Sequence, residues 1–376
     1  MLAAPSALVA VLPLLAPAAP ADVSADLEAI RERHALPALA GLLIEGGEVA
    51  AVGASGVRAA GSDEPARADD VWHLGSCTKA MTATLLATLV ADGTLAWETT
   101  LAEALPDLRE AMHEGLRGVT LRQLVRHEAG LATGGPPGLF VRLAVAERSG
   151  ELTTAEARRR FVEETLAAGP SGKIGVFAYA NAGYVIAGHV AERATGRSWE
   201  DLMRERVFGP LGMASAGFGP PGAAEEDPPA TPRGHTPEGR AIPPGPGADN
   251  PGFLGPAGTV HASLQDWARF VAAHLRGADL AEGERDALGL SAADYRELHA
   301  PGDGEAGNAA GWLVMRRAWA AGAGEASGPV LTHAGSNTMW FCVVWAAPGT
   351  DAAALVVTNI AGPAAPAATD EAAGVL

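Results

Sequence analysis

The chain has 376 residues, of which 48% are apolar, so it is long enough to form one large domain or two around a sizeable core. Acidic residues outnumber basic ones by 44 to 27, the formal charge is −17, and no run of Lys and Arg is present that would neutralise phosphates or anionic lipid. We therefore expect a globular protein that has neither nucleic acid nor a membrane surface as its partner.

The first residues have most features of a secretory signal. An apolar run, Ala7 to Leu15, precedes a small-residue site, Ala19-Pro20-Ala21, but no basic residue occurs before Arg31. The run is too short to span a bilayer, and no later stretch reaches the necessary length of about 20 residues. We expect residues 1–21 to be a signal peptide and the protein to be secreted or periplasmic. The alternatives are an apolar extension and a misplaced start.

The next segment predicts a helix followed by a hairpin. Ser24 precedes a helical pattern that runs to His34. Two strand-like segments, 39–44 and 49–57, then flank Gly46-Gly47, a pair typical of a two-residue hairpin turn.

The middle of the chain is predicted to be helical. Residues 76–91 are apolar nearly all round and end at Asp92-Gly93, which indicates a helix buried on every side. Helix-start signals then occur at Thr120 with Gln123, Asn181, Ser198, and Ser263 with Asp266.

A Pro- and Gly-rich segment, 215–252, is too long for a plain connector; we interpret it as a surface loop near a site or as a disordered spacer. Strand patterns return at 311–319, 330–333, 338–345 and 353–359.

The order of strands, helices and strands predicts an α/β (α+β) fold. We expect strands from both ends of the chain to share an antiparallel sheet flanked by helices, with an inserted all-helical subdomain and a cleft between the two parts. The expected catalytic domain is 22–376, in which 22–75 and 305–376 form the α/β part and 76–304 the helical part. Ten histidines are scattered without metal-ligand spacing, so we expect no metal and no cofactor.

Ser76 and Lys79 lie three residues apart at the start of the buried helix, so their side chains project from one face. A serine hydroxyl needs a partner that takes its proton, and a lysine desolvated at a helix N-terminus has the lowered pKa that suits this task. A serine N-cap followed by a surface lysine is the structural alternative. A lysine in an otherwise apolar helix favours the catalytic interpretation.

Two distant segments add candidate groups. Tyr179-Ala180-Asn181 precedes a strong helix, where a phenol and an amide on a loop are free to enter a cleft; the alternative is a packed tyrosine and an N-cap asparagine. His333-Ala334-Gly335 ends a strand, and its small residues allow another backbone to lie alongside; the alternative is an edge-strand histidine without a task.

These segments, in this order and spacing, resemble the serine beta-lactamase and penicillin-binding-protein superfamily. The closest resemblance is to the group of class C beta-lactamases, D-alanyl-D-alanine carboxypeptidases and family VIII esterases, in which the second motif is Tyr-x-Asn. Three longer stretches also match that group: 119–131, 208–213 and 256–270. The resemblance runs from about Ala38 to Asn359.

The resemblance implies an acyl-enzyme mechanism on an amide or ester carbonyl. It makes Ser76 the nucleophile and has Lys79 and Tyr179 share the proton transfers. It also implies that Asn181 holds the substrate, with His333 and Gly335 as part of the substrate-binding wall.

The oxyanion is expected to be held by the backbone N–H groups of Ser76 and Ser336. The rival interpretation is a penicillin- or peptidoglycan-binding module that is acylated with slow or no turnover, or is never acylated.

The sequence also departs from that group. The lactamases proper carry Lys where this chain has His333, and histidine is not a permanent cation near neutral pH. No Glu-bearing loop like that of class A lactamases is found. Beta-lactams, D-Ala-D-Ala-type peptides and small esters therefore all stay open as substrates.

Two further expectations concern the two cysteines and the C-terminal end of the chain. Cys77 and Cys342 are expected to be buried free thiols, with a bridge between them as the alternative. After Asn359 the sequence is broken by proline, so we expect a helix of only one or two turns, with a truncated chain as the alternative.

Overall fold

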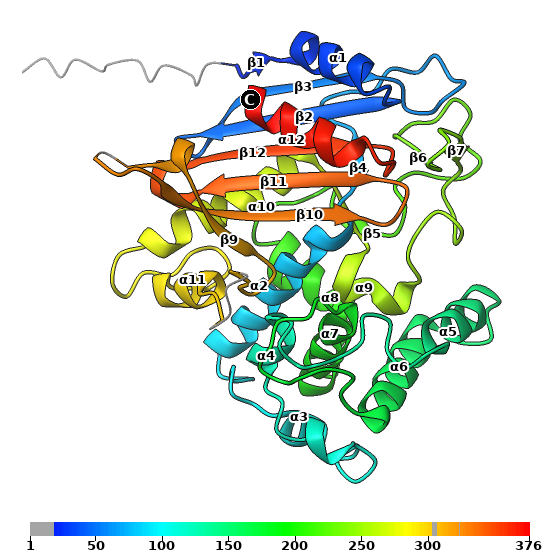
Figure 1. Ribbon diagram of the computed structural model, residues 1–376, viewed down its shortest axis with the longest axis vertical. Coiled ribbons are helices and arrows are strands. Elements are labelled where there is room, and N and C mark those ends of the chain that lie inside the picture. Colours follow the sequence, from blue (N-terminus) through cyan, green and yellow to red (C-terminus); the bar gives the residue numbers. More distant parts are fainter. Residues whose placement is uncertain (1–18, 303–306, 323) are drawn as a thin grey trace, which may run out of the picture.

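The computed structural model describes residues 19–302, 307–322 and 324–376. Most of the expected signal peptide, residues 1–18, lies outside the described part of the chain. Figure 1 shows a sheet above a group of helices, and the N-terminal and C-terminal strands lie together in that sheet.

The main sheet has seven strands in the order β1-β3-β2-β12-β11-β10-β9. All neighbours pair antiparallel except β1 and β3, which pair parallel. The strands are β1 (Ala21–Asp22), β2 (Ala38–Glu45), β3 (Glu48–Gly56), β9 (Leu313–Arg317), β10 (Gly328–Ser336), β11 (Phe341–Ala347) and β12 (Ala352–Thr358). This arrangement confirms the predicted fold class, in which both ends of the chain build one sheet.

The predicted glycine turn forms the β2–β3 hairpin. Gly46 and Gly47 both have positive φ, 55° and 74°, as a two-residue turn of the primed type requires. The hairpin then joins the end of the chain, because β2 pairs with β12 from Leu39 opposite Thr358 to Glu45 opposite Ala352.

Helices cover both faces of the sheet (Figure 1). On one face, α1 (Ser24–Arg33) and α12 (Ala365–Val375) enclose a small apolar cluster that includes Leu39 and Val356. On the other face, α10 (Leu264–Arg276) and the helical part bury the larger core, which includes Leu42 and Leu355. Residues that alternate along a strand therefore enter different cores.

The expectation of a C-terminal helix of only one or two turns is wrong, because α12 is an 11-residue helix. Its proline, Pro366, lies in the first turn, where a missing N–H group breaks no helical hydrogen bond. Ala365, Ala368 and Ala372 are fully buried against the sheet.

The middle of the chain is helical, as predicted. Its helices are α2 (Thr78–Ala91), α3 (Leu101–Ala104), α4 (Leu121–Val125), α5 (Leu139–Arg148), α6 (Thr154–Ala168), α7 (Asn181–Thr195), α8 (Trp199–Met203), α9 (Gly255–Gly258) and α11 (Ala292–His299). The expected caps form at Thr120, Ser198 and Ser263, whose side chains each accept a hydrogen bond from the backbone three residues later. None of the helices in the described residues has both the length and the apolar character needed to cross a bilayer.

The long segment after Ser215 has a defined path. It contains β5 (Gly217–Phe218) and a small hairpin, β6 (Gly234–His235) with β7 (Ala241–Ile242). β5 joins β8 (Val260–Ser263), which also pairs with β4 (Val71–His73), the strand that leads into the site. The strand that follows the segment, β8, therefore pairs with the strand that comes just before Ser76.

Candidate active site

Ser76 lies in a single 3-10 turn, Gly75–Cys77, that leads directly into α2. Its Oγ atom is 3.1 Å from Nζ of Lys79 and 2.9 Å from the hydroxyl oxygen of Tyr179. The structure thus brings together the serine, the lysine one turn later and the tyrosine from a segment about 100 positions away. A hydroxyl held between an amine and a phenol has the geometry of an activated nucleophile.

Lys79 is fully buried, with 0% of its surface exposed. Its Nζ atom also donates a hydrogen bond of 2.7 Å to the carbonyl of Ala257 in α9. Burial lowers the pKa of Lys79 from 10.5 to about 7, against a smaller opposing effect of the Cys77 thiolate. Near neutral pH the amine therefore has a substantial unprotonated fraction, as a general base needs.

Tyr179 precedes α7 and is 40% exposed, so its ring forms part of the surface of the site. Burial of its hydroxyl end raises its pKa, while the hydrogen bond to Ser76 opposes that change. The phenol is therefore protonated at neutral pH and donates to Ser76. Nζ of Lys79 lies 4.9 Å from the centre of the Tyr179 ring, which places base, phenol and serine in one group.

His127 supports Tyr179 from the opposite side. Its ring centre lies 4.6 Å from that of Tyr179, and its Nδ1 atom accepts a hydrogen bond of 3.1 Å from the backbone N–H of Ala180. Burial, together with the nearby charge of Lys79, lowers the pKa of His127 to about 3, so the ring stays a neutral acceptor. Sequence reasoning did not identify this residue, although it lies within the matched stretch 119–131.

Gly335 explains how β10 can lie against the nucleophile turn. A Cβ atom at this position would be 2.0 Å from the carbonyl oxygen of Leu74 and 3.0 Å from the backbone nitrogen of Cys77. Gly75, at φ 47°, is equally restricted, because its Cβ would lie 2.3 Å from the backbone nitrogen of Ser336. Two glycines therefore allow the backbone around Ser76 and the backbone around Ser336 to pack in direct contact.

His333 and Asn181 take different positions around the serine. β9 pairs with β10 only as far as Thr332, so His333 lies where the described residues leave that edge of β10 unpaired. His333, Tyr179 and His127 line one cavity of about 470 Å³. The other residues that line this cavity are mostly apolar and include Trp312.

Asn181 is the first residue of α7, and its amide has no protein hydrogen-bond partner among the described residues. The alternative in which Asn181 caps its helix is wrong, since the N-cap residue is Ala180.

Cys77 and Cys342 are free and buried, as expected, with their Sγ atoms 3.6 Å apart. Burial raises the pKa of the Cys77 thiol, but its hydrogen bonds with Cys342 and at His333 and the electrostatic effects of His333 and Lys79 together lower this pKa by more. The pKa of Cys342 is raised by burial. Cys77, next to Ser76, is therefore one of the groups that affect the pKa of Lys79, and its charge raises that pKa.

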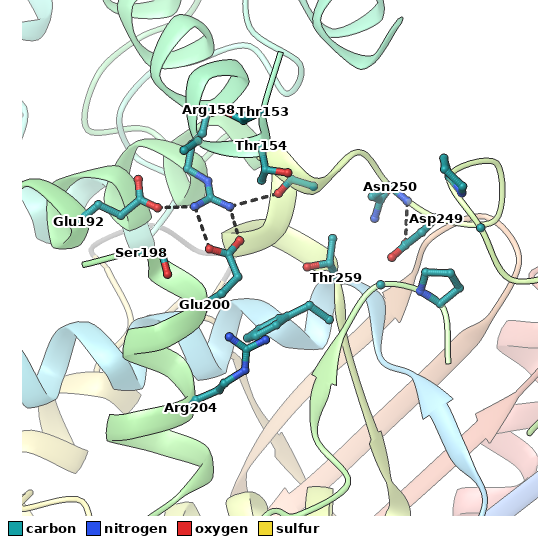
Figure 2. Close-up of a pocket in the computed structure, with 17 residues that line it drawn as sticks. Thr153, Thr154, Arg158, Glu192, Ser198, Glu200, Arg204, Asp249, Asn250 and Thr259 are labelled. Atoms are coloured by element: carbon teal, nitrogen blue, oxygen red, sulfur yellow. Dashed lines mark hydrogen bonds and ion pairs between the residues drawn. The ribbon is translucent and has the colours of Figure 1, made fainter. Parts of the chain in front are cut away.

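A second cavity, of about 650 Å³, lies beside α6 and α8 and is drawn in Figure 2. Arg158, only 1% exposed, forms ion pairs there with Glu192 and Glu200. At the other end of the cavity are Asp249 and Asn250, from the end of the long segment 215–252 (Figure 2). Because Arg158 is already paired with two carboxylates, this cavity lacks a free buried cation for an anionic ligand.

Comparison with known proteins gives four findings. A model of the Beta-lactamase family matches residues 23–376. Penicillin-binding protein 4 of Amycolatopsis lactamdurans is 30% identical over 342 residues, which are 88% of this chain and 83% of that protein. Esterase EstB of Burkholderia gladioli is 30% identical over 197 residues, 51% of this chain and 49% of the esterase.

The fourth finding is a likeness of fold. The crystal structure of a D-stereospecific amidohydrolase from Streptomyces sp. superposes with a TM-score of 0.70 and covers 93% of this chain and 98% of its own, at 20% identity.

Proposed function

Because the chain belongs to the Beta-lactamase family, we propose that it is a serine hydrolase that cleaves an ester or amide bond through an acyl-enzyme on Ser76. The similarity to a penicillin-binding protein and to an esterase supports hydrolysis of a carbonyl compound. It leaves the choice between beta-lactam, D-amino-acid peptide and ester to experiment. We also retain the proposal, from residues 1–21, that the protein is exported.

The observation that carries the proposal is the pair of hydrogen bonds at Ser76. Its Oγ atom is within 3.1 Å of a buried amine and 2.9 Å of a phenol, and the amine has a pKa of about 7. A lysine packed only for structure would have no reason to be wholly buried next to a hydroxyl.

The mechanism follows from the protonation states. Unprotonated Lys79 takes the proton of Ser76 as Oγ attacks the carbonyl carbon, and the negative charge that forms on the carbonyl oxygen is stabilised by the N–H groups of Ser76 and Ser336. Tyr179, which bonds to the same Oγ atom, passes a proton to the leaving group. Water then attacks the acyl-enzyme. Tyr179 takes the proton of the water, Lys79 returns its proton to Oγ, and Ser76 is restored.

The substrate lies along the open edge of β10 in this proposal. His333 offers a hydrogen-bonding ring rather than a lysine charge. The cavity beside it is mainly apolar, and Arg317 is the permanent cation among the residues that line it. We assign Asn181, whose amide is unpartnered among the described residues, the role of binding a polar group of the substrate. We therefore expect an ester or amide with an apolar substituent to be bound well, and a carboxylate on the substrate to be attracted by Arg317 rather than by His333.

A fluorophosphonate probe, with intact-mass analysis, tests the nucleophile. Wild-type protein should gain one adduct, Ser76→Ala should gain none, and Ser149→Ala, whose hydroxyl only caps α5, should react like wild type. A wild type that is not modified, or a Ser76→Ala variant that is modified equally, refutes the assignment. Hydrolysis of a nitrophenyl ester, a chromogenic cephalosporin and a D-Ala-D-Ala peptide by the same preparation then ranks the substrate classes.

Slow turnover is the second candidate, favoured by the similarity to a penicillin-binding protein along 88% of the chain. In that case a cephalosporin would give a stoichiometric burst followed by little further product, and the acyl-enzyme would persist in mass spectra. Continuous turnover of every substrate that acylates Ser76 would exclude this candidate.

A further inference from the structure

A buried polar cluster lies directly behind the two N–H groups assigned to the oxyanion. It consists of His73, Asp249 and Asn337, which are 1%, 9% and 4% exposed. They come from three distant parts of the chain: β4, the end of the long segment 215–252, and the turn after β10. None of the three is used by the mechanism above, and a buried polar cluster is costly unless it has a task or is fully satisfied.

One oxygen of Asp249 joins the other two residues. Its Oδ1 atom accepts hydrogen bonds of 2.6 Å from the backbone N–H of Asn250 and 2.9 Å from Nδ2 of Asn337. The same atom lies 2.8 Å from Nε2 of His73, a close contact whose N–H is not aimed along the line between the atoms. Its Oδ2 atom has no partner among the described residues. Asp249 lines the second cavity, as Figure 2 shows. The carboxylate therefore acts through Oδ1.

Two of these three partners, His73 and Asn337, each hold one of the two oxyanion segments. Nδ1 of His73 accepts the backbone N–H of Gly75 at 3.0 Å, immediately before Ser76. An acceptor at Nδ1 leaves the ring proton on Nε2, which faces Asp249. The ring is further held by Trp340, which stacks on it at 5.6 Å.

On the other side, Asn337 follows Ser336 directly. Its Oδ1 atom accepts the backbone N–H groups of Met339 and Trp340 at 3.2 and 3.1 Å and so fixes the turn between β10 and β11. The two segments meet at Gly75, whose missing side chain leaves room for the nitrogen of Ser336. A shift of either segment would change the separation of the two N–H groups.

We propose that Asp249 is a positioning residue, which fixes the two oxyanion N–H donors relative to each other by holding His73 and Asn337 at one oxygen. The inference rests on the proposed function, because it assigns Asp249 a task in stabilising the negative charge formed at Ser76. It also gives the long segment 215–252 a role, since that segment carries Asp249 to the site. Misplacing catalytic groups by about 1 Å can cost about 100-fold in rate.

The test compares Asp249→Ala with Asp249→Asn in the full-length protein. The alanine removes the shared acceptor. We therefore expect kcat for a nitrophenyl ester, per titrated active site, to fall about 10- to 100-fold. KM should change little, because the oxyanion charge exists only in the transition state. The fluorophosphonate reaction should slow in parallel. Asparagine keeps an oxygen at the Oδ1 position and should restore most of the rate.

Asp266→Ala is the matched control, since Asp266 is 7% exposed and accepts bonds from the N–H and hydroxyl of Ser215 at the opposite end of the same segment. It should lower the unfolding temperature and leave the rate per active site unchanged. If Asp249→Ala does not fold, His73→Asn replaces it: asparagine can still accept the Gly75 N–H but is too short to reach Asp249, and the same fall in kcat is expected.

The outcomes separate the two proposals. A wild type that neither reacts with the probe nor hydrolyses any ester overturns the proposed function and this inference with it. A reactive wild type, combined with unchanged kcat per active site in Asp249→Ala or His73→Asn, overturns the inference alone. An equal loss in Asp266→Ala would also overturn it, because the effect would then belong to the segment in general.

Discussion

The buried amine of Lys79 should make the stability of the protein depend on pH in a way that one substitution removes. In the unfolded chain the lysine has its ordinary pKa of 10.5, and in the folded protein burial lowers that pKa to about 7. Between these values the unfolded chain binds a proton that the folded protein does not, so the free energy of unfolding rises with pH. Below pH 7 both states are protonated and this contribution no longer changes.

The magnitude follows from the same two values. Each pKa unit corresponds to about 1.4 kcal/mol, so charging Lys79 in the folded protein costs about 5 kcal/mol relative to the unfolded chain, as an upper limit. Methionine has a similar length and no charge, and Lys79→Met avoids this cost. The advantage of the methionine variant should therefore be largest at pH 7 and below and decrease by about 1.4 kcal/mol per pH unit up to about pH 10.

Urea unfolding of wild type and Lys79→Met at pH 7, 8 and 9 measures this difference. Subtracting the two proteins removes the contributions of all other titrating groups that both share. Because Lys79 is still half protonated in the folded protein at pH 7, the difference should shrink by about 2 kcal/mol from pH 7 to pH 9. The same measurement on Lys173→Met, at the exposed second lysine, should give no trend. A difference for Lys79→Met that is constant over this range would refute a lowered pKa, and with it the general base in the mechanism.

Three further predictions concern the same site. Tyr179→Phe should reduce kcat by about 10²- to 10⁴-fold while the fold is kept, because only the proton-transferring hydroxyl is lost. Steady-state kinetics and circular dichroism measure both, and full activity would require another group to protonate the leaving group. Gly335→Ala should lower the unfolding temperature and abolish probe labelling, since its Cβ would lie 2.0 Å from the Leu74 carbonyl; a stable, active variant would contradict that contact. Cys77→Ala removes a charge that raises the pKa of Lys79, so the rising limb of the kcat/KM profile should move to lower pH; a shift to higher pH would contradict it.

Local patterns in the sequence were enough to predict much of the fold and the position of the reactive trio. Gly46-Gly47 favours a tight turn because both residues accept a positive φ, and the helix that follows Ser76 is apolar on every side and so must be buried. Both predictions depend on neighbouring residues only. Ser76, Lys79 and Tyr179 came together because the spacing of three segments matched a family. Their roles remain a proposal that the labelling experiment tests.

What the sequence could not provide depends on residues that are distant along the chain. Asp249 reads as part of a proline-rich loop, and its contact with His73 appears only when that loop has returned to β4. His127 looks like the end of a short helix, but it adopts a positive φ of 59° and turns its ring under Tyr179. Pro366 suggested a break in the helix. Proline is tolerated in the first turn of a helix and disrupts its interior, and the sequence alone does not distinguish these two positions.

The pairing of β2 with β12 has a consequence for biosynthesis. Thr358 in β12 donates its hydroxyl hydrogen bond to the carbonyl of Ala38, which is 320 positions earlier in the chain. On the ribosome, one edge of the first hairpin is therefore without its final neighbour while nearly all of the remaining protein is made. An unpaired strand edge readily joins other chains, and sheets with such distant partners fold slowly. We expect newly made chains to depend on chaperones until β12 has emerged, and catalytic competence to appear only after synthesis is complete.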